Sequence, residues 1–299
     1  MVPAGISKFA VQPVESLLNR KLLINAGGRL IDLSEPRIMG VINITPDSFY
    51  SGSRYSGGTG ALKAAEGFLA EGADIIDIGG CSTRPGSPLL STSEERDRVI
   101  PVFKQVRREF PEAVLSIDTF RAEIAREARY EAGADIVNDV SGGTLDEGMA
   151  GVISELKVPY IMMHMRGTPA TMQGLSEYDD VVTDVIQWFG KRIPALFRAG
   201  VSDIIIDPGI GFAKSISQNF EILRRLREFH ILGLPLLAGV SRKSMIWRTL
   251  DSDPGKALNG TTALNMAALM NGADILRVHD VKEARETVIL FQKLKAGHR

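Results

Sequence analysis

The chain has 299 residues, of which 44% are hydrophobic and 24% charged, and its formal net charge is −1. This is ordinary globular composition, and the near-zero charge disfavours the broad basic surface that binds nucleic acid or anionic membranes. The single cysteine, Cys81, excludes an internal disulfide, and no apolar run reaches the roughly 18 residues that a membrane helix needs.

The N-terminal region predicts an extension that contains a hairpin. Residues 1–21 lack the basic region and continuous apolar core of a secretory signal, which together with the lone cysteine favours a cytoplasmic protein. Residues 21–33, KLLINAGGRLIDL, alternate apolar and polar residues around Gly27 and Gly28 and therefore predict a β-hairpin. We assign residues 1–36 to an extension of a single domain, in which the hairpin covers the N-terminal end of a barrel.

From residue 37 onward, short apolar strands alternate with helical patterns. A phrase recurs as EGADIIDIGG at 71–80, EAGADIVNDV at 131–140 and NGADILRVHD at 271–280, with a looser copy at 198–207. In each copy a helical pattern ends at a glycine, a buried strand follows, and polar residues close the strand. This order is typical of the αβ unit of a parallel sheet.

Counting these units predicts the fold class. The predicted strands are Arg37–Asn43, Asp74–Gly79, Val114–Asp118, Asp135–Asn138, Pro159–His164, Asp203–Asp207, Leu234–Val240 and Asp274–His279. The predicted helices are about 59–71, 93–109, 121–132, 145–157, 177–199, 217–230, 257–271 and 282–295. Eight strands alternating with eight helices predict an α/β fold, a (β/α)8 TIM barrel over residues 37–299. An open doubly wound sheet is the alternative.

Polar side chains follow each predicted strand, at the end where a TIM barrel carries its chemistry. They include Asn43, Asp118, Asn138, Asp139, His164, Asp207, Lys214, Lys243, Arg277 and His279. Arg277 and His279 are two residues apart on a strand, so both face the same side. Two cationic or cationisable groups at a barrel mouth need an anion.

Several of these residues also have a purely structural interpretation. Asp118 is equally consistent with a cap on the next helix, and Asn138 with Asp139 is equally consistent with a turn. We interpret His164, in the apolar segment PYIMMHM, as a packed histidine rather than a catalyst. The basic residues of the helix that carries Arg107 are interpreted as a solvated face.

The remaining polar groups suggest classes of ligand. Arg277 and His279, with Arg84 in the second loop, suit a phosphate or diphosphate. The oxygen-rich first loop, NITPDSF at 43–49, suits a hard cation such as Mg²⁺, which keeps waters and shares substrate phosphates.

A second ligand is suggested by two carboxylates near an amide. Asp118 and Asp207, with Asn138, suit a flat heterocycle rich in N–H donors, and Lys243 supplies a cation for a carbonyl oxygen. The sequence contains no zinc-ligand spacing, no phosphate-binding P-loop and no Ser-His-Asp signature.

Seven motifs that follow one another along the chain resemble those of the dihydropteroate synthase family. In order, they are NITPDSF, GGCSTRPG, SIDT, VNDVSGG, DPGIGFAK, GVSRKS and RVHD. The resemblance runs from about Arg37 to the C-terminus. It implies a transferase of folate biosynthesis that joins 4-aminobenzoate to (7,8-dihydropterin-6-yl)methyl diphosphate, giving 7,8-dihydropteroate and diphosphate. It also implies small-molecule partners, Mg²⁺, sulfonamide binding at the aminobenzoate site, and a homodimer formed through barrel helices.

The resemblance also implies roles for individual residues. The pterin site would contain Asp118, Asn138, Val140, Met163, Asp207 and Lys243. The diphosphate site would contain Asn43, Thr83, Arg277 and His279, with Asn43 also at the metal. The aminobenzoate site would contain Thr83, Arg84, Pro85, Phe212 and Ser244. Asp118, Lys243, Arg277 and His279 would carry the catalysis, which is a dissociative displacement of diphosphate.

Two positions depart from the family pattern. Ser51 stands where the first loop usually has an acidic residue, and Cys81 stands where the second motif usually has Glu. A methyltetrahydrofolate-binding methyltransferase domain and a catalytically silent pterin-binding module are the competing interpretations. The first would not need a diphosphate clamp, and the second would be expected to lose Lys243, Arg277 or His279, all of which are present.

Overall fold

The parallel strands of a computed structural model, which describes residues 20–44, 57–81 and 90–296, close into a barrel. The strands are β3 (Arg37–Asn43), β4 (Ile75–Gly79), β5 (Leu115–Asp118), β6 (Ile136–Asp139), β7 (Tyr160–Met163), β8 (Ile204–Asp207), β9 (Leu237–Ala238) and β10 (Ile275–Val278). Their order is β8-β7-β6-β5-β4-β3-β10-β9, and a parallel bridge between Ile206 and Leu236 joins the two ends. This closure confirms the TIM barrel over the open sheet.

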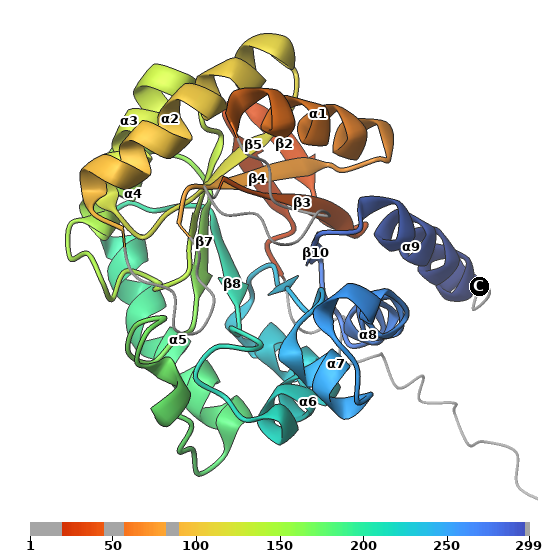
Figure 1. The fold of residues 1–299 in the computed structure, drawn as a ribbon. Coiled ribbons are helices and arrows are strands. Elements are labelled where there is room, and N and C mark those ends of the chain that lie inside the picture. The colour runs from red at the N-terminus through yellow and green to blue at the C-terminus, as the bar shows by residue number, and fades with distance from the viewer. Residues whose placement is uncertain (1–19, 45–56, 82–89, 297–299) are drawn as a thin grey trace, which may run out of the picture.

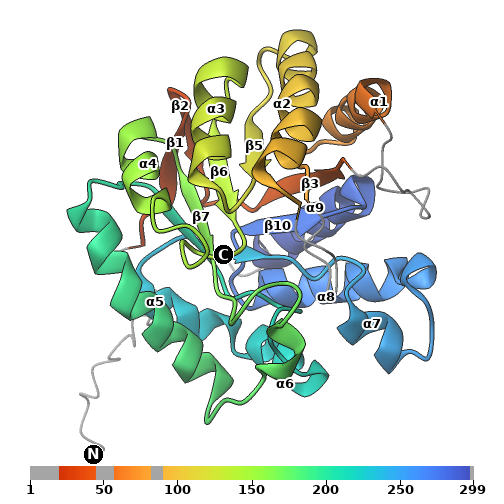
Figure 2. The ribbon, with the colours of Figure 1, turned by 60° about the vertical axis from the view of Figure 1, so that its left-hand side comes forward.

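Helices surround the barrel, as Figures 1 and 2 show. They are α1 (Gly57–Ala70), α2 (Thr92–Glu109), α3 (Ala122–Ala132), α4 (Met149–Leu156), α5 (Val181–Arg198), α6 (Ile216–Arg224), α7 (Ser244–Thr249), α8 (Leu258–Met270) and α9 (Val281–Ala296). Short 3₁₀ segments are η2 (Met172–Gly174), η3 (Leu226–Leu232) and η4 (Pro254–Lys256). Within the described ranges, no helix combines the length and apolarity required to cross a bilayer.

Three elements differ from the sequence prediction. The predicted strand 234–240 contracts to β9, since Pro235 has no N–H to donate and pairing with β10 extends only over Leu237 and Ala238. The predicted helix 217–230 ends at Arg224 and continues as η3. The helix α7 was not predicted, because six residues are too few to display a helical period.

The hairpin closes the N-terminal end of the barrel, as predicted. Its strands β1 (Leu23–Ala26) and β2 (Arg29–Asp32) pair in antiparallel fashion on either side of Gly27 and Gly28. A buried apolar layer contains Ile24, Ala26 and Leu33 together with Met39, Ile75, Ile136, Ile161, Ile205, Leu237 and Ile275 from the barrel strands. Because this end is filled with apolar side chains, the polar interior lies toward the other end.

The recurring phrase places an aspartate at the start of every second barrel strand. Asp74 accepts a hydrogen bond from the Ile38 amide of the neighbouring strand at 2.8 Å. The next copy repeats this with Asp135 and the Leu115 amide (3.0 Å).

The last copy does the same with Asp274 and the Leu236 amide (2.8 Å). In the looser copy, Asp203 accepts from the Asn25 amide of the hairpin instead (3.2 Å). Each carboxylate therefore satisfies a backbone donor that would otherwise be orphaned at the end of the sheet.

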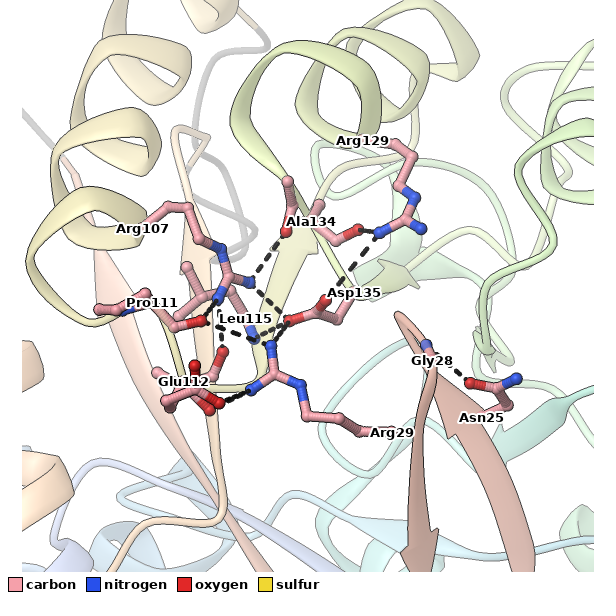
Figure 3. A network of polar contacts seen from close by, with 12 residues as sticks. Asn25, Gly28, Arg29, Arg107, Pro111, Glu112, Leu115, Arg129, Ala134 and Asp135 are labelled. Carbon is pink, nitrogen blue, oxygen red and sulfur yellow. Dashed lines mark hydrogen bonds and ion pairs between the residues drawn. The ribbon is translucent and has the colours of Figure 1, made fainter.

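Every one of these carboxylates is paired with a cation. The network around Asp135, which Figure 3 shows, contains the most arginines. Arg107 Nη2 lies 2.5 Å from Asp135 Oδ2, and one guanidinium nitrogen each of Arg29 and Arg129 lies 3.9 Å from this carboxylate. Arg107 also donates to the carbonyl oxygens of Pro111, Ala113 and Gly133. The interpretation of Arg107 as part of a solvated face was wrong, because its side chain folds back under the barrel to the buried Asp135.

The hairpin turn is seated on the same carboxylate. Gly27 has a φ of +62°, and a Cβ atom there would lie 2.1 Å from Asp135 Oδ1. Only glycine fits such a close approach with a left-handed backbone. The Asp135 network thus connects the hairpin to β5, α2 and α3.

We expect Asp135→Asn to lower the free energy of unfolding by about 3 kcal/mol, since it leaves the Arg107 guanidinium without its buried counter-charge. Urea denaturation measures this loss. The control is Glu131→Gln, which breaks an ion pair with Lys104 between side chains that are 55% and 44% exposed. That pair is expected to contribute less than about 1 kcal/mol. Equal losses in the two variants would contradict the role assigned to Asp135.

Candidate active site

A cavity of about 400 Å³, measured with its open mouth, lies at the C-terminal end of the barrel. Its lining includes the predicted residues Asn138, Val140, Met163, Asp207, Phe212, Lys243, Arg277 and His279. Val41, Gly239 and Ser241 also line it, although the sequence analysis assigned none of them to a binding site. The barrel therefore brings Val41 and His279, which are 238 positions apart in the sequence (279 − 41), into one site.

Strand register explains this convergence. Asp118 of β5 is opposite Asn138 of β6, and Met163 of β7 is opposite Asp207 of β8. Residues that are opposite each other in a parallel pair face the same side of the sheet, and here they face the barrel interior. β6, β7 and β8 contribute Asn138, Met163 and Asp207 to the cavity in this way.

A buried charge cluster forms the floor of the site. Arg277 Nε donates to Asp77 Oδ2 at 2.8 Å, and Arg277 Nη2 donates to Asp118 Oδ2 at 2.6 Å. Asn138 Nδ2 donates to the same Asp77 oxygen at 3.0 Å. Burial raises the pKa of the Asp118 carboxyl to about 7, with Arg277 opposing the rise. Arg277, by contrast, stays cationic because Asp77 and Asp118 raise its pKa despite burial.

Asp77 is a site residue that the sequence analysis missed. It is fully buried in the middle of β4, where every neighbouring residue of the strand is buried as well. The sequence did contain a signal for this role: an aspartate within an otherwise apolar strand is expected to be buried, and a buried carboxylate requires a polar partner. Its second oxygen, Oδ1, has no hydrogen-bond partner among the described residues.

The helix-cap interpretation of Asp118 is not supported. At the start of α3 the Ala122 amide donates to Asp146 Oδ2 at 2.8 Å, whereas Asp118 is directed to Arg277. The turn interpretation does hold for Asp139, which accepts from the Ser141 and Gly143 amides at 2.7 and 2.8 Å. Asn138 and Asp139 are consecutive on β6, and their side chains therefore lie on opposite sides of the sheet.

Asp207 and Lys243 form the opposite wall. Asp207 Oδ1 accepts from the Gly209 amide at 2.8 Å, so the carboxylate orders a turn and lines the cavity. Lys243 donates to the Ile210 carbonyl oxygen, and its Nζ lies 4.8 Å from the centre of the Phe212 ring. Burial lowers the pKa of Lys243 to about 8, and the nearby Asp207 opposes this change. The ammonium is therefore confined beside an aromatic ring.

His164 is a packed histidine, as predicted. Its imidazole is 1% exposed and meets the Trp188 ring edge-on at 5.0 Å. Lys214 Nζ lies 3.0 Å from His164 Nδ1 and donates to the carbonyl oxygens of Gly209 and Phe212. Burial, followed by the charge of Lys214, lowers the pKa of His164 to about 2. The neutral ring accepts from Lys214, and together they brace the segment that carries Phe212.

Of the other predicted residues, some lie within the described part of the chain and some lie outside it. Asn43 ends β3 opposite Gly79, and Ser244 begins α7 directly after Lys243. Thr83, Arg84 and Pro85 lie outside the described residues, as do Ser51 and residues 1–19. Cys81 is buried just beyond the end of β4. Within the described part of the chain, acidic, histidine and cysteine side chains do not gather into a group of three that could hold a metal ion.

Comparison with known proteins agrees with this geometry. The model of the pterin binding enzyme family matches residues 39–279. The dihydropteroate synthase of Synechocystis sp. is 46% identical over 248 residues, which span 82% of this chain and 85% of the relative. A crystal structure of the Yersinia pestis dihydropteroate synthase in a sulfonamide complex superposes with a TM-score of 0.87 at 39% identity, covering 92% of this chain and 99% of that one.

A Xanthomonas albilineans dihydropteroate synthase in complex with 7,8-dihydropteroate gives a TM-score of 0.81 at 35% identity, covering 92% of this chain and 99% of that one. These matches extend over nearly the whole barrel and include the cavity-lining residues between Val41 and His279. The chain therefore belongs to the pterin-binding enzymes and, among them, to the dihydropteroate synthase family.

Proposed function

We propose that the protein is a dihydropteroate synthase, a transferase of folate biosynthesis. It would condense (7,8-dihydropterin-6-yl)methyl diphosphate with 4-aminobenzoate and release diphosphate and 7,8-dihydropteroate. The observation that carries this proposal is one cavity whose lining combines a carboxylate and an amide with three cationic or cationisable side chains. The first set suits a heterocycle and the second set an anionic leaving group.

The pterin would bind between the polar groups on the cavity floor and wall. Asn138 and Asp207 offer an amide and a carboxylate to the amino-pyrimidine edge, and Lys243 offers an ammonium to the ring carbonyl. Val140 and Met163 are buried apolar residues that line the same cavity. A flat ring with polar edges is complementary to such an arrangement, because apolar side chains pack on its faces and polar groups meet its edge.

The diphosphate would bind near Arg277 and His279, and the family resemblance adds Asn43 and Thr83 to this site. Two of the three guanidinium nitrogens of Arg277 are engaged by carboxylates, so its orientation is fixed before substrate arrives. A preorganised cation stabilises charge that develops on a departing oxygen without reorganisation at the moment of reaction.

Asn43 fits a magnesium site of the kind that shares its ligands with a substrate. It supplies a carboxamide oxygen at the end of β3, and Mg²⁺ typically combines one or two protein oxygens with waters and substrate phosphates. When bound, Mg²⁺ would neutralise charge on the diphosphate oxygens. The protein's own contribution is to hold Asn43, Arg277 and His279 around the same anion.

The reaction would proceed as a dissociative displacement. The bond between the pterin methylene carbon and the diphosphate oxygen breaks, the diphosphate keeps the electron pair, and the dihydropterin shares the positive charge. Ionised Asp118 would favour that cation from the cavity floor. The amino nitrogen of 4-aminobenzoate then forms the new bond with its lone pair and loses a proton.

The aminobenzoate would lie toward Phe212 and Ser244, with Thr83, Arg84 and Pro85 of the second loop completing its site. The Phe212 ring beside Lys243 provides an apolar face next to a cation, which suits an aromatic carboxylate. The sulfonamide bound to the Yersinia pestis relative supports the expectation that this protein is also a sulfonamide target.

We also propose a homodimer formed through α8 and α9. The thirteen residues of α8 include no charged side chain, although the helix lies on the outside of the barrel. Met270 on α8 and Ile289, Leu290 and Leu294 on α9 are exposed. A surface helix normally turns charged residues to water, so an apolar outer face favours a covering partner.

We place the protein in the cytoplasm, which its single cysteine supports.

The purified protein is expected to form 7,8-dihydropteroate and release diphosphate only with both substrates and Mg²⁺ present. Diphosphate release coupled to a colorimetric assay, with product identified by mass spectrometry, tests this. Full turnover in excess chelator would remove the role given to Asn43. Binding of a pterin without product formation would instead favour the silent pterin-binding module.

Asp118→Asn is expected to lower kcat by about a hundredfold, because the carboxylate stabilises charge that develops in the transition state. The variant should lose some stability but still fold, since Arg277 keeps Asp77 as a partner. In the unsubstituted protein, kcat/KM should fall as pH decreases below about 7, since protonation of Asp118 removes the required charge. The variant should lack this limb of the pH profile. A variant that keeps both the rate and the limb would exclude Asp118 from the reaction.

Leu290→Glu is expected to weaken dimerisation at least tenfold, because it buries a charge in an apolar interface. Sedimentation velocity over a range of concentrations measures the change. Leu30→Glu on the hairpin is the matched control, since Leu30 is 69% exposed and Leu290 is 61% exposed. A monomeric unsubstituted protein, or equal behaviour of the two variants, would exclude α9 as the interface.

A further inference from the structure

Ser241 and His279 lie on neighbouring segments of the barrel mouth and share a two-point contact. The Ser241 hydroxyl oxygen is 2.9 Å from His279 Nδ1, and the His279 backbone amide donates to the same oxygen at 3.2 Å. Ser241 is 5% exposed and lines the cavity together with His279. The serine therefore contacts the histidine at both its backbone and its ring.

Proton accounting at this contact distinguishes the two neutral tautomers of His279. The backbone amide can only donate, so the serine oxygen accepts there. If Nδ1 also carried a proton, the Ser241 oxygen would accept two hydrogen bonds. The hydroxyl proton of Ser241 would then have no acceptor among the described residues. If Nδ1 is bare, the hydroxyl proton goes to it and every group is satisfied. The proton of the neutral imidazole then resides on Nε2, on the opposite side of the ring.

The surroundings keep this imidazole neutral. Burial, followed by the charge of Arg277, lowers the pKa of His279 to about 4. Lys243 and Arg242 act in the same direction, and Asp280 opposes them. Asp280 is itself engaged by Arg242, whose Nε and Nη2 donate to its two oxygens at 2.9 and 2.6 Å. At neutral pH the ring thus has a single N–H to offer, and its position decides what it can bind.

The backbone around Ser241 is also held in place. Arg242 has a φ of +53°, a left-handed conformation that is unfavourable for a residue with a side chain. The contacts of Ser241 with His279 and of Arg242 with Asp280 join the two segments at consecutive positions. The hydroxyl is therefore presented to Nδ1 by a fixed backbone.

We propose that Ser241 is a positioning residue that fixes His279 in the Nε2–H tautomer, so that the neutral imidazole donates a hydrogen bond to the departing diphosphate. The proposal rests on the proposed function in its choice of anion, whereas the tautomer itself does not depend on it. No proton transfer by His279 is needed, because a preoriented N–H stabilises the developing negative charge directly. Without the serine hydroxyl, the ring would divide between two tautomers and two orientations.

Two-bond ¹H–¹⁵N correlation spectra of the ¹⁵N-histidine-labelled protein test the tautomer without any substrate. The chain has four histidines, and the spectrum of His279→Gln identifies the signal of interest. At pH 7 we expect His279 to have a bare Nδ1 and a protonated Nε2. In Ser241→Ala we expect a mixture of tautomers. A proton on Nδ1 in the unsubstituted protein, or an unchanged tautomer in the variant, would overturn the proposal.

Kinetics then test the consequence for the reaction. Ser241→Ala is expected to lower kcat about tenfold, the effect of one hydrogen bond, and Ser241→Thr to restore most of it because the hydroxyl is retained. Ser217→Ala, at an exposed serine of α6, is the control and should leave the rate unchanged. Inorganic diphosphate with Mg²⁺ should shift the Nε2 signal of the unsubstituted protein. An inactive protein with the expected tautomer would refute the proposed function alone, whereas full activity in Ser241→Ala would refute the role of Ser241.

Discussion

The half-buried guanidinium of Arg277 is held by two buried carboxylates, and its pairing with Asp77 and Asp118 is the interaction on which the site depends. Removing a charge from water costs several kcal/mol unless partners replace the solvent. Here the partners come from β4 and β5 while the cation comes from β10. The cluster therefore fixes the relative positions of three strands and also sets the polarity of the cavity floor. The pKa of Asp118 is about 7 because burial raises it while the charge of Arg277 lowers it.

The two ends of the barrel use aspartate for different purposes. At the N-terminal end, Asp74, Asp135 and Asp274 each accept a backbone amide at the start of a neighbouring strand segment and pair with arginines. These contacts close the sheet, and Asp135 also seats the hairpin. At the C-terminal end, Asp207 lines the cavity, and Asp118 accepts from Arg277, which lines the cavity as well. The C-terminal end, where TIM barrels carry their chemistry, instead holds charges in an arrangement suited to binding a ligand.

Neutral histidines serve this arrangement in two ways. His164 accepts from Lys214 and supports the segment that carries Phe212, whereas His279 accepts from Ser241 and turns its other nitrogen away. In both cases burial near cations disfavours the imidazolium, so the ring acts as an acceptor at one nitrogen and a donor at the other. The residue that contacts Nδ1 fixes the direction in which the Nε2–H of the histidine can donate. In this way the partner residue controls which ligand the histidine can bind.

The sequence by itself determined the alternation of strands and helices, the hairpin at 21–33 and the polar residues at strand ends, because these follow from local periodicity and from glycine-terminated helices. It also predicted that Arg277 and His279 face the same side, since that depends only on a two-residue spacing. Only the tertiary structure decided that Arg107 serves Asp135, that Asp77 anchors Arg277 and that Ser241 orients His279. Each of these contacts joins residues 28 to 200 positions apart, and such partners become neighbours only when the barrel closes and strand register brings their side chains to one point.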